Sequence, residues 1–366
     1  MNKQKNKIAI ISNSLGLGGA EKFASLLSYI LSDLGYEIHN IIIDDVVKYK
    51  VSGKLINLGI NYKNDFSIIR KFKKGIIINN YLKNNNISIV IDNRSRPILI
   101  REFFTKYIYS NCKTIYLVHL SKLDIYLSKP IFLSRIIYQS ASKIVCVSKS
   151  IEEEIIRNYK LKNTETIYNP QPIDSIDLFN MEKLPEKYFI YFGRLDENQK
   201  NLCFMLESFF ISKVYENDFH LILIGDGESE SLLRNKIEEL KLAKFVTIKP
   251  FSTNVLAYVK KARASVLSSN YEGFPMSIIE SLSIEIPVIS VDCPSGPKEI
   301  IIDKMNGLLV EMNNKVALSN AFITFAFDEV VYQNCKSNAK KSIEHLSIEK
   351  ISKQWEKLIN TIYNEN

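Results

Sequence analysis

The sequence has no long apolar run and few cysteines. No stretch of about 18 residues is free of charged side chains, so we expect no transmembrane helix. The start, MNKQKNKIAIISNSLG, contains no extended apolar segment, and we expect no signal peptide. The cysteines form no Cys-x-x-Cys pair and stand at positions 112, 146, 203, 293 and 335. This pattern fits a reducing cytoplasm and argues against a disulfide framework and a cysteine zinc site.

Charge is unevenly divided along the chain. The net charge is +8, but residues 1–165 carry 26 lysines and arginines against 13 carboxylates, and the remainder carries 22 against 27. A basic half joined to a mildly acidic half indicates that one part meets an anionic partner. On composition alone, a lysine-rich solvated surface is the alternative.

Short apolar runs alternate with amphipathic stretches, which predicts a parallel α/β architecture. In the first half we expect strands at 8–12, 38–43, 87–92, 114–119 and 143–148, and helices at 20–34, 67–84, 97–109 and 130–141. In the second half we expect strands at 188–194, 220–225, 245–250, 264–269, 287–291 and 307–310, and helices after residue 314. The proline-containing stretch 166–187 has little periodicity and predicts a linker. A chain of 366 residues is long enough for two domains, and parallel sheets bind ligands at the carboxyl ends of their strands.

A glycine-rich loop, SNSLGLGGAEKF (12–23), joins the first predicted strand to the first helix. Its glycines let the backbone approach a ligand closely, and the N–H groups that open the following helix suit an anion. The loop invites a dinucleotide interpretation with Asp44 or Asp45 on the ribose, but Glu21 stands where that fingerprint needs a small residue. A purely structural tight turn is the other alternative.

The stretch FGRLDENQKNL (192–202) opens the second half with a charged loop. Arg194 and Lys200 flank this loop, an arrangement that can hold a diphosphate with a guanidinium fork and a point charge. Taken alone, the stretch could equally be a solvated charged loop.

The stretch NYEGFPMSIIES (270–281) places two glutamates on either side of a glycine-proline turn. Pro275 suits the first position of a helix, which leaves nearby backbone N–H groups for a phosphate. Glu280 lies beside the buried stripe of that helix, where a carboxylate can bind a ribose diol. Glu272, before the turn, can reach sugar hydroxyls. Either glutamate alone could be a surface carboxylate.

Together these stretches resemble the retaining, nucleotide-sugar-dependent glycosyltransferases of family 4. The resemblance spans nearly the whole chain, is most specific over 188–310, and rests on the motifs GLGGAEKF, FGRLDENQKNL, LIGDGESESLLRNKIEEL, NYEGFPMSIIESLSIEIPVISVDCPSGPKEII and NGLLV. It implies the GT-B fold, in which two Rossmann-like parallel-sheet domains face each other across a cleft. The implied divisions are an acceptor-binding domain at 1–165, a linker at 166–187, a nucleotide-sugar-binding domain at 188–345, and a C-terminal helix at 346–366 that packs back toward the first domain.

The resemblance also assigns roles to individual residues. Arg194 and Lys200 are expected to neutralise the donor diphosphate in place of a metal ion. Glu272 would hold the transferred sugar, Glu280 the ribose, and His119 would approach the sugar hydroxyls, although a satisfied histidine at a strand end is the alternative. The remaining donor contacts implied are Gly18, Gly19, Lys249, Pro250, Gly273, Phe274 and Pro275. The implied catalytic set is His119, Arg194, Lys200 and Glu272, with no metal and no cofactor besides the donor. The turn PSGPKE (294–299) receives no contact.

The function implied is transfer of a hexose or N-acetylhexosamine, with retention, from a UDP-sugar to a lipid-linked or oligosaccharide acceptor. The pathway would build a bacterial surface polysaccharide such as O-antigen, capsule or lipopolysaccharide. The alternatives are a sugar phosphorylase, a nucleotide-sugar epimerase, a nicotinamide-dependent oxidoreductase, which Glu21 disfavours, and a binding module without catalysis.

Two basic stretches in the first half, 65–83 and 94–109, mix cations with apolar residues at helical spacing. Each apolar stripe could be the core face of a helix. The charge of this half favours a surface for an acceptor diphosphate or an anionic leaflet, and hence peripheral attachment to the cytoplasmic face of the membrane. We expect no nucleic-acid partner. The cations expected to contact acceptor or membrane are Lys71, Lys73, Lys74, Arg94, Arg96 and Arg101.

Overall fold

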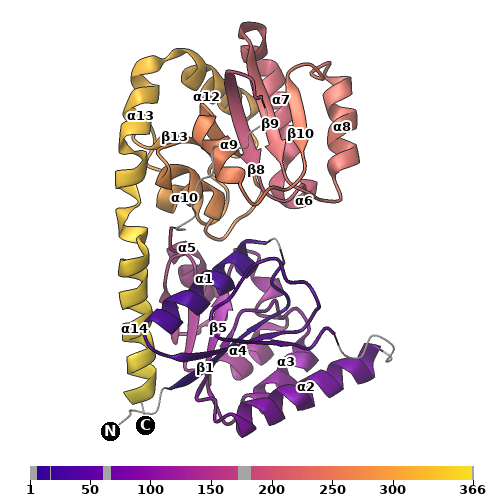
Figure 1. The fold of residues 1–366 in the computed structure, drawn as a ribbon, viewed down its shortest axis with the longest axis vertical. Coiled ribbons are helices and arrows are strands. Elements are labelled where there is room, and N and C mark those ends of the chain that lie inside the picture. The colour runs from indigo at the N-terminus through magenta and orange to yellow at the C-terminus, as the bar shows by residue number, and fades with distance from the viewer. Residues whose placement is uncertain (1–5, 17, 61–66, 172–182, 365–366) are drawn as a thin grey trace. The chain divides into compact units, whose positions relative to one another are not determined.

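The computed structural model of the protein describes residues 6–16, 18–60, 67–171 and 183–364, without the side chains of 67–71. The chain divides into two compact units (Figure 1). Unit 1 comprises residues 1–169 together with 348–366, and unit 2 comprises residues 170–347. Part of the predicted linker, residues 172–182, lies outside the described residues.

Unit 1 contains a parallel sheet in the order β3-β2-β1-β4-β5-β6-β7. Its strands are β1 (Lys7–Ser12), β2 (Glu37–Ile42), β3 (Lys54–Asn57), β4 (Ile89–Asp92), β5 (Lys113–Val118), β6 (Lys143–Cys146) and β7 (Thr164–Thr166). The five apolar strands were predicted, whereas β3 and β7 were not. Both missed strands lie at the sheet edges and carry no apolar run, so their sequences lack the signal of a buried strand.

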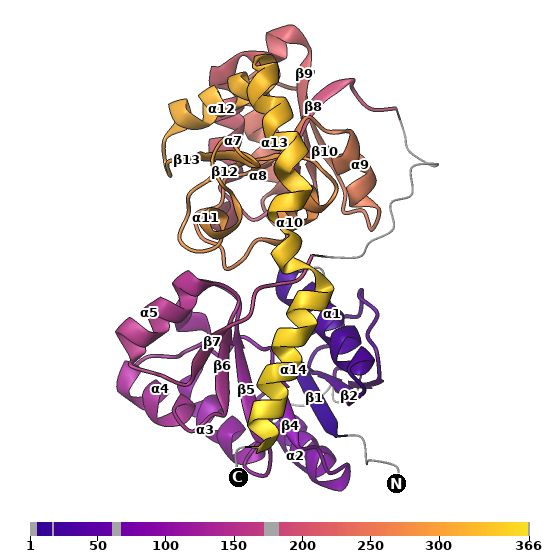
Figure 2. The same cartoon turned by 90° about the vertical axis from the view of Figure 1, so that its left-hand side faces the viewer.

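Helices cover both faces of this sheet (Figures 1 and 2). They are α1 (Gly19–Asp33), α2 (Ser67–Asn84), α3 (Leu99–Ile108), α4 (Ile131–Tyr138), α5 (Lys149–Tyr159) and α14 (Ile348–Asn364), with a short 3-10 turn η1 (Leu123–Ile125). The last helix of the chain packs beside α1, and its fully buried Trp355 lies 6.4 Å from the ring of Phe23. The core on this face of the sheet therefore combines the two ends of the chain.

Unit 2 contains a second parallel sheet, in the order β10-β9-β8-β11-β12-β13. Its strands are β8 (Lys187–Phe192), β9 (Phe219–Ile224), β10 (Val246–Lys249), β11 (Ala264–Leu267), β12 (Val288–Val291) and β13 (Gly307–Val310). Its helices are α6 (Glu197–Lys200), α7 (Leu202–Ser212), α8 (Glu230–Glu239), α9 (Val255–Lys261), α10 (Met276–Ser283), α11 (Pro297–Ile300), α12 (Lys315–Phe327) and α13 (Glu329–Ser342), with 3-10 turns η2 (Val214–Asn217) and η3 (Glu344–Leu346). All six strands were predicted.

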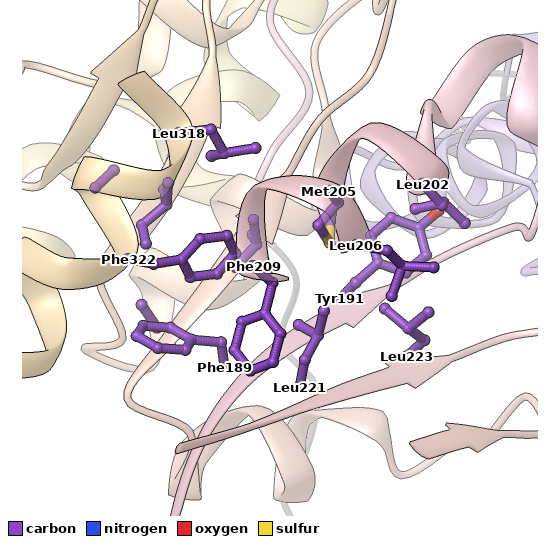
Figure 3. Packing of buried hydrophobic residues seen from close by; sticks show 14 of the residues in the cluster. Phe189, Tyr191, Leu202, Met205, Leu206, Phe209, Leu221, Leu223, Leu318 and Phe322 are labelled. Carbon is purple, nitrogen blue, oxygen red and sulfur yellow. The ribbon is translucent and has the colours of Figure 1, made fainter. Parts of the chain in front are cut away.

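Helices α7 and α12 pack side by side, and apolar residues fill the space between them and the sheet (Figure 3). Phe322 of α12 contacts Phe209 of α7 and Phe189 of β8 edge-to-face, with ring centroids 5.5 and 5.0 Å apart. Such aromatic pairs add about 0.5–1.5 kcal/mol to the free energy gained from burial. This packing fixes β8 and the start of α7, and with them the loop between the two.

Both sheets have the strand order of a Rossmann fold, which confirms the two predicted Rossmann-like units. The order reverses between β1 and β4 in unit 1 and between β8 and β11 in unit 2. Ligands of such sheets bind beside these strands, at their carboxyl ends. None of the helices in the described part of the chain is long and apolar enough to span a membrane.

Candidate active site

In unit 2, the loop after β8 is tied to the loop after β11. The Ser268 hydroxyl donates to the carbonyl oxygens of Lys200 and Asn201, at 2.8 and 3.1 Å. The backbone N–H of Asn270 donates to the Gln199 carbonyl oxygen at 2.8 Å. The two charged stretches that the sequence offered separately therefore form one surface, at the point where the strand order reverses.

The centre of this surface is a buried ion pair. Lys200 Nζ lies 2.6 Å from Glu272 Oε1, and the exposed fractions of the two side chains are 14% and 6%. The Ser269 hydroxyl donates to the same carboxylate oxygen at 2.7 Å. Burial and then the nearby Glu272 charge raise the pKa of the Cys293 thiol, so the carboxylate acts in a poorly solvated setting. Two residues that the sequence singled out are thus held in contact, with opposite charges.

The second glutamate lies on α10. We predicted Pro275 at the first helical position. The helix instead begins at Met276, and Pro275 is its N-cap. The helix is buried on nearly all sides, and Glu280 is itself only 6% exposed. A carboxylate side chain is rarely buried to this extent unless it is paired.

The turn PSGPKE, for which no contact was predicted, supports the loop before α10. The Ser295 hydroxyl donates to the Gly273 carbonyl oxygen at 2.7 Å, and the Pro294 carbonyl oxygen accepts from the Glu272 N–H at 3.3 Å. Gly296 has φ +94°, and a Cβ there would lie 2.6 Å from Pro275 Cδ. A glycine is therefore required where the two loops meet.

Other predicted donor residues of unit 2 lie on loops at the same edge of the sheet. Arg194 is exposed, and its guanidinium donates to Gln199 Oε1 at 3.4 Å. Lys249 ends β10, and Pro250 after it is exposed. The loop after β9 packs closely here, because a Cβ on Gly225 would lie 1.8 Å from the Gly193 carbonyl oxygen.

In unit 1, His119 follows β5 and is 8% exposed. Its Nε2 lies 2.6 Å from Asn93 Oδ1, and its ring meets Phe23 edge-to-face at 5.3 Å. Burial, and then Arg96, lower the pKa of His119 to about 3, so the imidazole is neutral at physiological pH.

The glycine-rich loop reaches α1 at the same edge of the unit 1 sheet. Gly18 is the N-cap of α1, and Gly19 is its first residue. A Cβ built on Gly19 meets no described atom within 4 Å. Neighbouring residues therefore do not account for the glycine at 19, and the space beside the helix start is open to a ligand.

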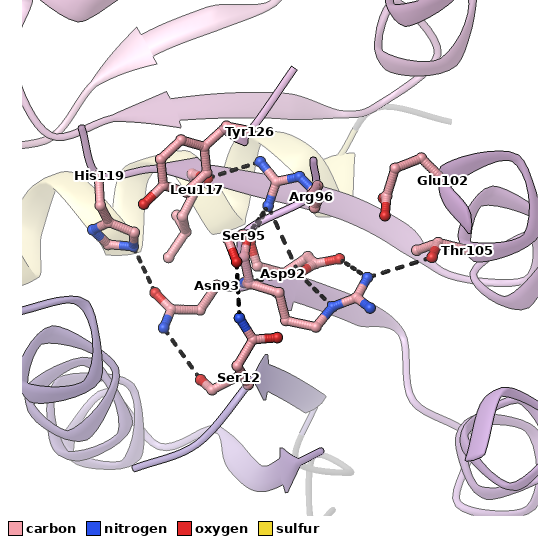
Figure 4. A network of polar contacts seen from close by, with 12 residues as sticks. Ser12, Asp92, Asn93, Ser95, Arg96, Glu102, Thr105, Leu117, His119 and Tyr126 are labelled. Carbon is pink, nitrogen blue, oxygen red and sulfur yellow. Dashed lines mark hydrogen bonds and ion pairs between the residues drawn. The ribbon is translucent and has the colours of Figure 1, made fainter. Parts of the chain in front are cut away.

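Three of the six cations assigned to acceptor or membrane are buried, which corrects that prediction. Arg94 donates to both carboxylate oxygens of Asp92, at 3.0 and 2.6 Å. Arg96, which is 0% exposed, lies beside the same residue (Figure 4). Arg96 donates to the carbonyl oxygens of Asp92, Arg94 and Leu117 and lies 4.9 Å from the ring centroid of Tyr116. These arginines neutralise an internal carboxylate and hold backbone groups, and cannot meet a membrane surface.

The third buried cation is Lys74, whose Nζ donates to the Ile43 carbonyl oxygen. Arg101 is partly exposed and donates to the Ser95 carbonyl oxygen at 3.0 Å and to Glu102 at 3.3 Å. Lys73 is exposed on α2, and the side chain of Lys71 lies outside the described residues.

Several residues of the site escaped the sequence analysis. Ser268, Ser269 and Ser295 are small polar residues beside motifs, and nothing in one sequence separates them from ordinary loop serines. Asn93 had a weak signal, since it is a polar residue directly after a buried strand. Among the described residues no group of three or more His, Cys, Asp or Glu side chains is arranged to hold a metal ion.

Comparisons with known proteins show which proteins this chain is similar to. The family model described as glycosyl transferases group 1 matches residues 175–342. The chain is 29% identical over 349 residues to the N-acetylgalactosamine-N,N'-diacetylbacillosaminyl-diphospho-undecaprenol 4-alpha-N-acetylgalactosaminyltransferase of Campylobacter jejuni, in an alignment that covers 91% of this chain and 94% of that protein. It is 30% identical over 338 residues to an uncharacterized glycosyltransferase of Methanocaldococcus jannaschii, with 80% of each chain covered.

The fold also matches that of a solved structure. A mutant of TarM from S. aureus superposes with a TM-score of 0.76 at 15% identity, covering 97% of this chain and 100% of that chain. The predicted GT-B fold is confirmed. The chain belongs to the glycosyltransferases.

Proposed function

We propose that this glycosyltransferase moves a hexose or N-acetylhexosamine from a UDP-sugar, with retention, to a glycan or lipid-linked acceptor in the assembly of a bacterial surface polysaccharide. The observation that carries the proposal is the buried Lys200–Glu272 pair, with Glu280 on the helix that follows. A cation and two carboxylates can divide the donor among them: Lys200 takes the diphosphate, Glu272 the sugar and Glu280 the ribose.

The chemistry proposed needs positive charge where the leaving group gains negative charge. As the glycosidic bond breaks, the diphosphate gains charge, and Lys200 with the exposed Arg194 stabilises it. The backbone that carries Lys200 is held in place by the loop contacts with Ser268 and Asn270. The leaving phosphate then assists deprotonation of the acceptor hydroxyl on the same face of the sugar. Neither glutamate acts as a nucleophile, unlike the carboxylate pair of a retaining glycosidase.

The comparisons support the donor and acceptor classes. The C. jejuni relative is named for transfer of N-acetylgalactosamine to a diphospho-undecaprenol-linked sugar. The structure of the TarM mutant holds UDP and alpha-GlcNAc-glycerol. A nucleotide diphosphate donor and a lipid-diphosphate acceptor would both be anionic. Negative charge of this kind suits loop cations such as Arg194 and Lys200.

The test of this function is turnover of UDP-sugars in the presence and absence of chelator. We expect UDP release from one of a panel of UDP-hexoses and UDP-N-acetylhexosamines to continue in EDTA, because Arg194 and Lys200 supply the charge a metal would bring. The anomeric configuration of the product, read by NMR, should match that of the donor. Loss of turnover in EDTA with recovery on adding Mn²⁺ or Mg²⁺ would overturn metal independence, and inversion would overturn retention.

Two conservative substitutions separate the carboxylate roles. Glu280→Gln should weaken binding of UDP itself, whereas Glu272→Gln should weaken binding of the UDP-sugar and leave UDP affinity nearly unchanged. Loss of one charged hydrogen bond costs about 1.5–3 kcal/mol, or roughly 10- to 150-fold in Kd. Calorimetry with UDP and with UDP-sugar measures both. Equal affinities in both variants and in the native protein would rule out the assignment.

We also propose that unit 1 attaches to the cytoplasmic face of the membrane, through a surface that includes α3 of the predicted stretch 94–109 but not the buried Arg94 and Arg96. Helix α3 exposes Ile100, Phe103 and Tyr107 at 84%, 43% and 68%, and α4 exposes Phe132 and Ile136 at 64% and 47%. The helices are neighbours, since Lys106 Nζ donates to the Ile136 carbonyl oxygen at 3.2 Å. An apolar area of this kind on a monomer marks an interaction site.

The charges around this apolar surface favour an anionic leaflet. The sequences of α2, α3 and α4 contain a single carboxylate, Glu102, which is buried. Lys73 and Arg135 are exposed, and Lys106 is half-buried. Basic residues near an anionic leaflet contribute about 1 kcal/mol each, and the exposed apolar side chains can enter the interface.

Liposome sedimentation tests this surface. The native protein should sediment with anionic vesicles at low salt and be released at high salt, because counterions screen the attraction. Ile100→Ser combined with Phe132→Ser should reduce sedimentation while leaving UDP binding unchanged. Val330 in unit 2 is 82% exposed and provides the matched control, since Val330→Ser should sediment like the native protein. Sedimentation that is equal with neutral and anionic vesicles would contradict the proposal.

A further inference from the structure

A chain of hydrogen bonds in unit 1 determines how His119 presents its two nitrogens. The Asn93 side chain donates from Nδ2 to the Ala20 carbonyl oxygen at 3.1 Å and to Ser12 Oγ at 3.2 Å. A carbonyl oxygen can only accept, so the contact with Ala20 fixes which end of the Asn93 amide is the NH₂ group. The amide oxygen of Asn93 must then face His119 (Figure 4).

This orientation fixes the tautomer of the histidine. Asn93 Oδ1 lies 2.6 Å from His119 Nε2, and because an amide oxygen only accepts, Nε2 must carry the hydrogen. The ring is neutral, so Nδ1 has no hydrogen and offers a lone pair. Within the described residues no hydrogen bond reaches Nδ1. Nδ1 is also not one of the fully buried side-chain atoms that lack a partner, so it is accessible to a ligand.

The hydrogen bonds that run from Ser12 and Ala20 through Asn93 to His119, here called the relay, lie where a substrate would bind. Ser12 ends β1, Asn93 follows β4 and His119 follows β5, so all three lie at the carboxyl edge of the unit 1 sheet. Ala20 belongs to the first turn of α1, directly after Gly18 and Gly19. The relay therefore joins the glycine-rich loop to the histidine, beside the point where the strand order reverses.

We infer that Asn93 is a positioning residue that holds His119 in the Nε2–H form, so that Nδ1 accepts a hydrogen bond from a hydroxyl of the sugar being transferred. The inference rests on the proposed function for the identity of the ligand, but not for the tautomer. In this arrangement His119 is an acceptor that stays neutral, and the fixed amide of Asn93 prevents the ring from offering an N–H in the same place.

The tautomer is measured in the free protein by long-range ¹H–¹⁵N correlation spectra of ¹⁵N-histidine-labelled chain. The chain has four histidines, so His119→Gln identifies the His119 signals. We expect the Nε2–H pattern for His119, unchanged between about pH 5 and pH 9, because the ring does not protonate there. An Nδ1–H pattern, or rapid exchange between both forms, in the native protein would overturn the inference whatever the enzymatic activity.

Variants of Asn93 separate positioning from packing. Asn93→Leu keeps the side-chain size and removes the acceptor, and His119 should become a mixture of tautomers. Asn93→Asp retains an oxygen acceptor, so the Nε2–H pattern should persist and the pKa of His119 should rise beside the new charge. Asn40→Leu is the control for loss of a buried asparagine. Asn40 lies on β2, and its side chain donates to the Ser52 carbonyl oxygen at 2.7 Å. It should leave the His119 signals unchanged.

Kinetics complete the test. Asn93→Leu should lower kcat with the UDP-sugar about tenfold, the effect of one misdirected hydrogen bond, while the Kd for UDP stays at the native value. Asn93→Asp should recover part of this loss. A native kcat in Asn93→Leu with a scrambled tautomer would show that the tautomer does not serve transfer and would overturn the positioning role. If the native protein turns over no UDP-sugar, the proposed function fails. The spectra still show whether Asn93 holds His119 in the Nε2–H form.

Discussion

Replacing Lys200 with methionine is expected to remove most of the activity and to destabilise unit 2. Lys200 is one of the two cations that we assign to the donor diphosphate, and loss of one preorganised electrostatic contact of this kind lowers kcat by about 10²–10³. The same substitution leaves the Glu272 carboxylate, 6% exposed, without its partner. Breaking a buried pair costs about 3 kcal/mol, the lower end of the usual range, because the amine is partly solvated. Steady-state kinetics and urea unfolding measure the two effects.

A second substitution separates the two roles of Lys200. In Lys200→Met combined with Glu272→Gln, no buried charge remains unpaired, and the Ser269 hydroxyl can still donate to the amide oxygen. Stability should return while activity stays lost. Lys353 on α14 is the control, since its 2.6 Å pair with Glu349 is exposed, and Lys353→Met should change neither quantity. Retained activity in Lys200→Met would refute the assignment of the diphosphate to this lysine.

Replacing Asp92 with asparagine should unfold or severely weaken unit 1. Asp92 is 0% exposed and neutralises Arg94, while Arg96 lies 3.7 Å away. Without the carboxylate two buried guanidinium groups remain with insufficient negative charge, at a cost of about 3–5 kcal/mol. Glu102 is the matched control. Burial raises the pKa of Glu102, whereas the pKa of Asp92 is lowered, so Glu102→Gln should destabilise unit 1 less than Asp92→Asn does.

The pH dependence of unfolding provides a separate check on Asp92. Burial alone would raise the pKa of Asp92, but Arg94 and Arg96 outweigh it and lower the pKa below the usual value of 3.8. A carboxylate with a lowered pKa contributes stability that is fully present above 3.8 and is lost as the pH falls through the lower, folded-state value. The stability difference between the native protein and Asp92→Asn should therefore be constant from about pH 5 to pH 8 and shrink on strong acidification. A difference that is already small at pH 7 would contradict the structural role.

The sequence predicted those parts of the fold that depend on local pattern. Apolar runs identified the strands at both switch points, and Lys200 of 192–202 and Glu272 of 270–281 proved to be in contact in unit 2. It failed where burial depends on residues far apart in the chain. Arg94 and Arg96 belong to a type that is almost never buried unless paired, and they were assigned to the surface. Their burial depends on Asp92 and on tyrosines of β5 and α4 that only the folded sheet brings together.

The packing of α14 has a consequence for the order in which the protein is made. Trp355, Ile359 and Ile362 complete the core of unit 1, yet they are translated only after all of unit 2. All of unit 2 lies between them and the first part of unit 1. Unit 2 can therefore fold as a continuous segment during synthesis, whereas one apolar face of the unit 1 sheet stays uncovered until α14 has been synthesised. A chain that stops before α14 would contain an intact unit 2 and an incomplete unit 1 with exposed apolar surface, which makes it prone to aggregation and degradation.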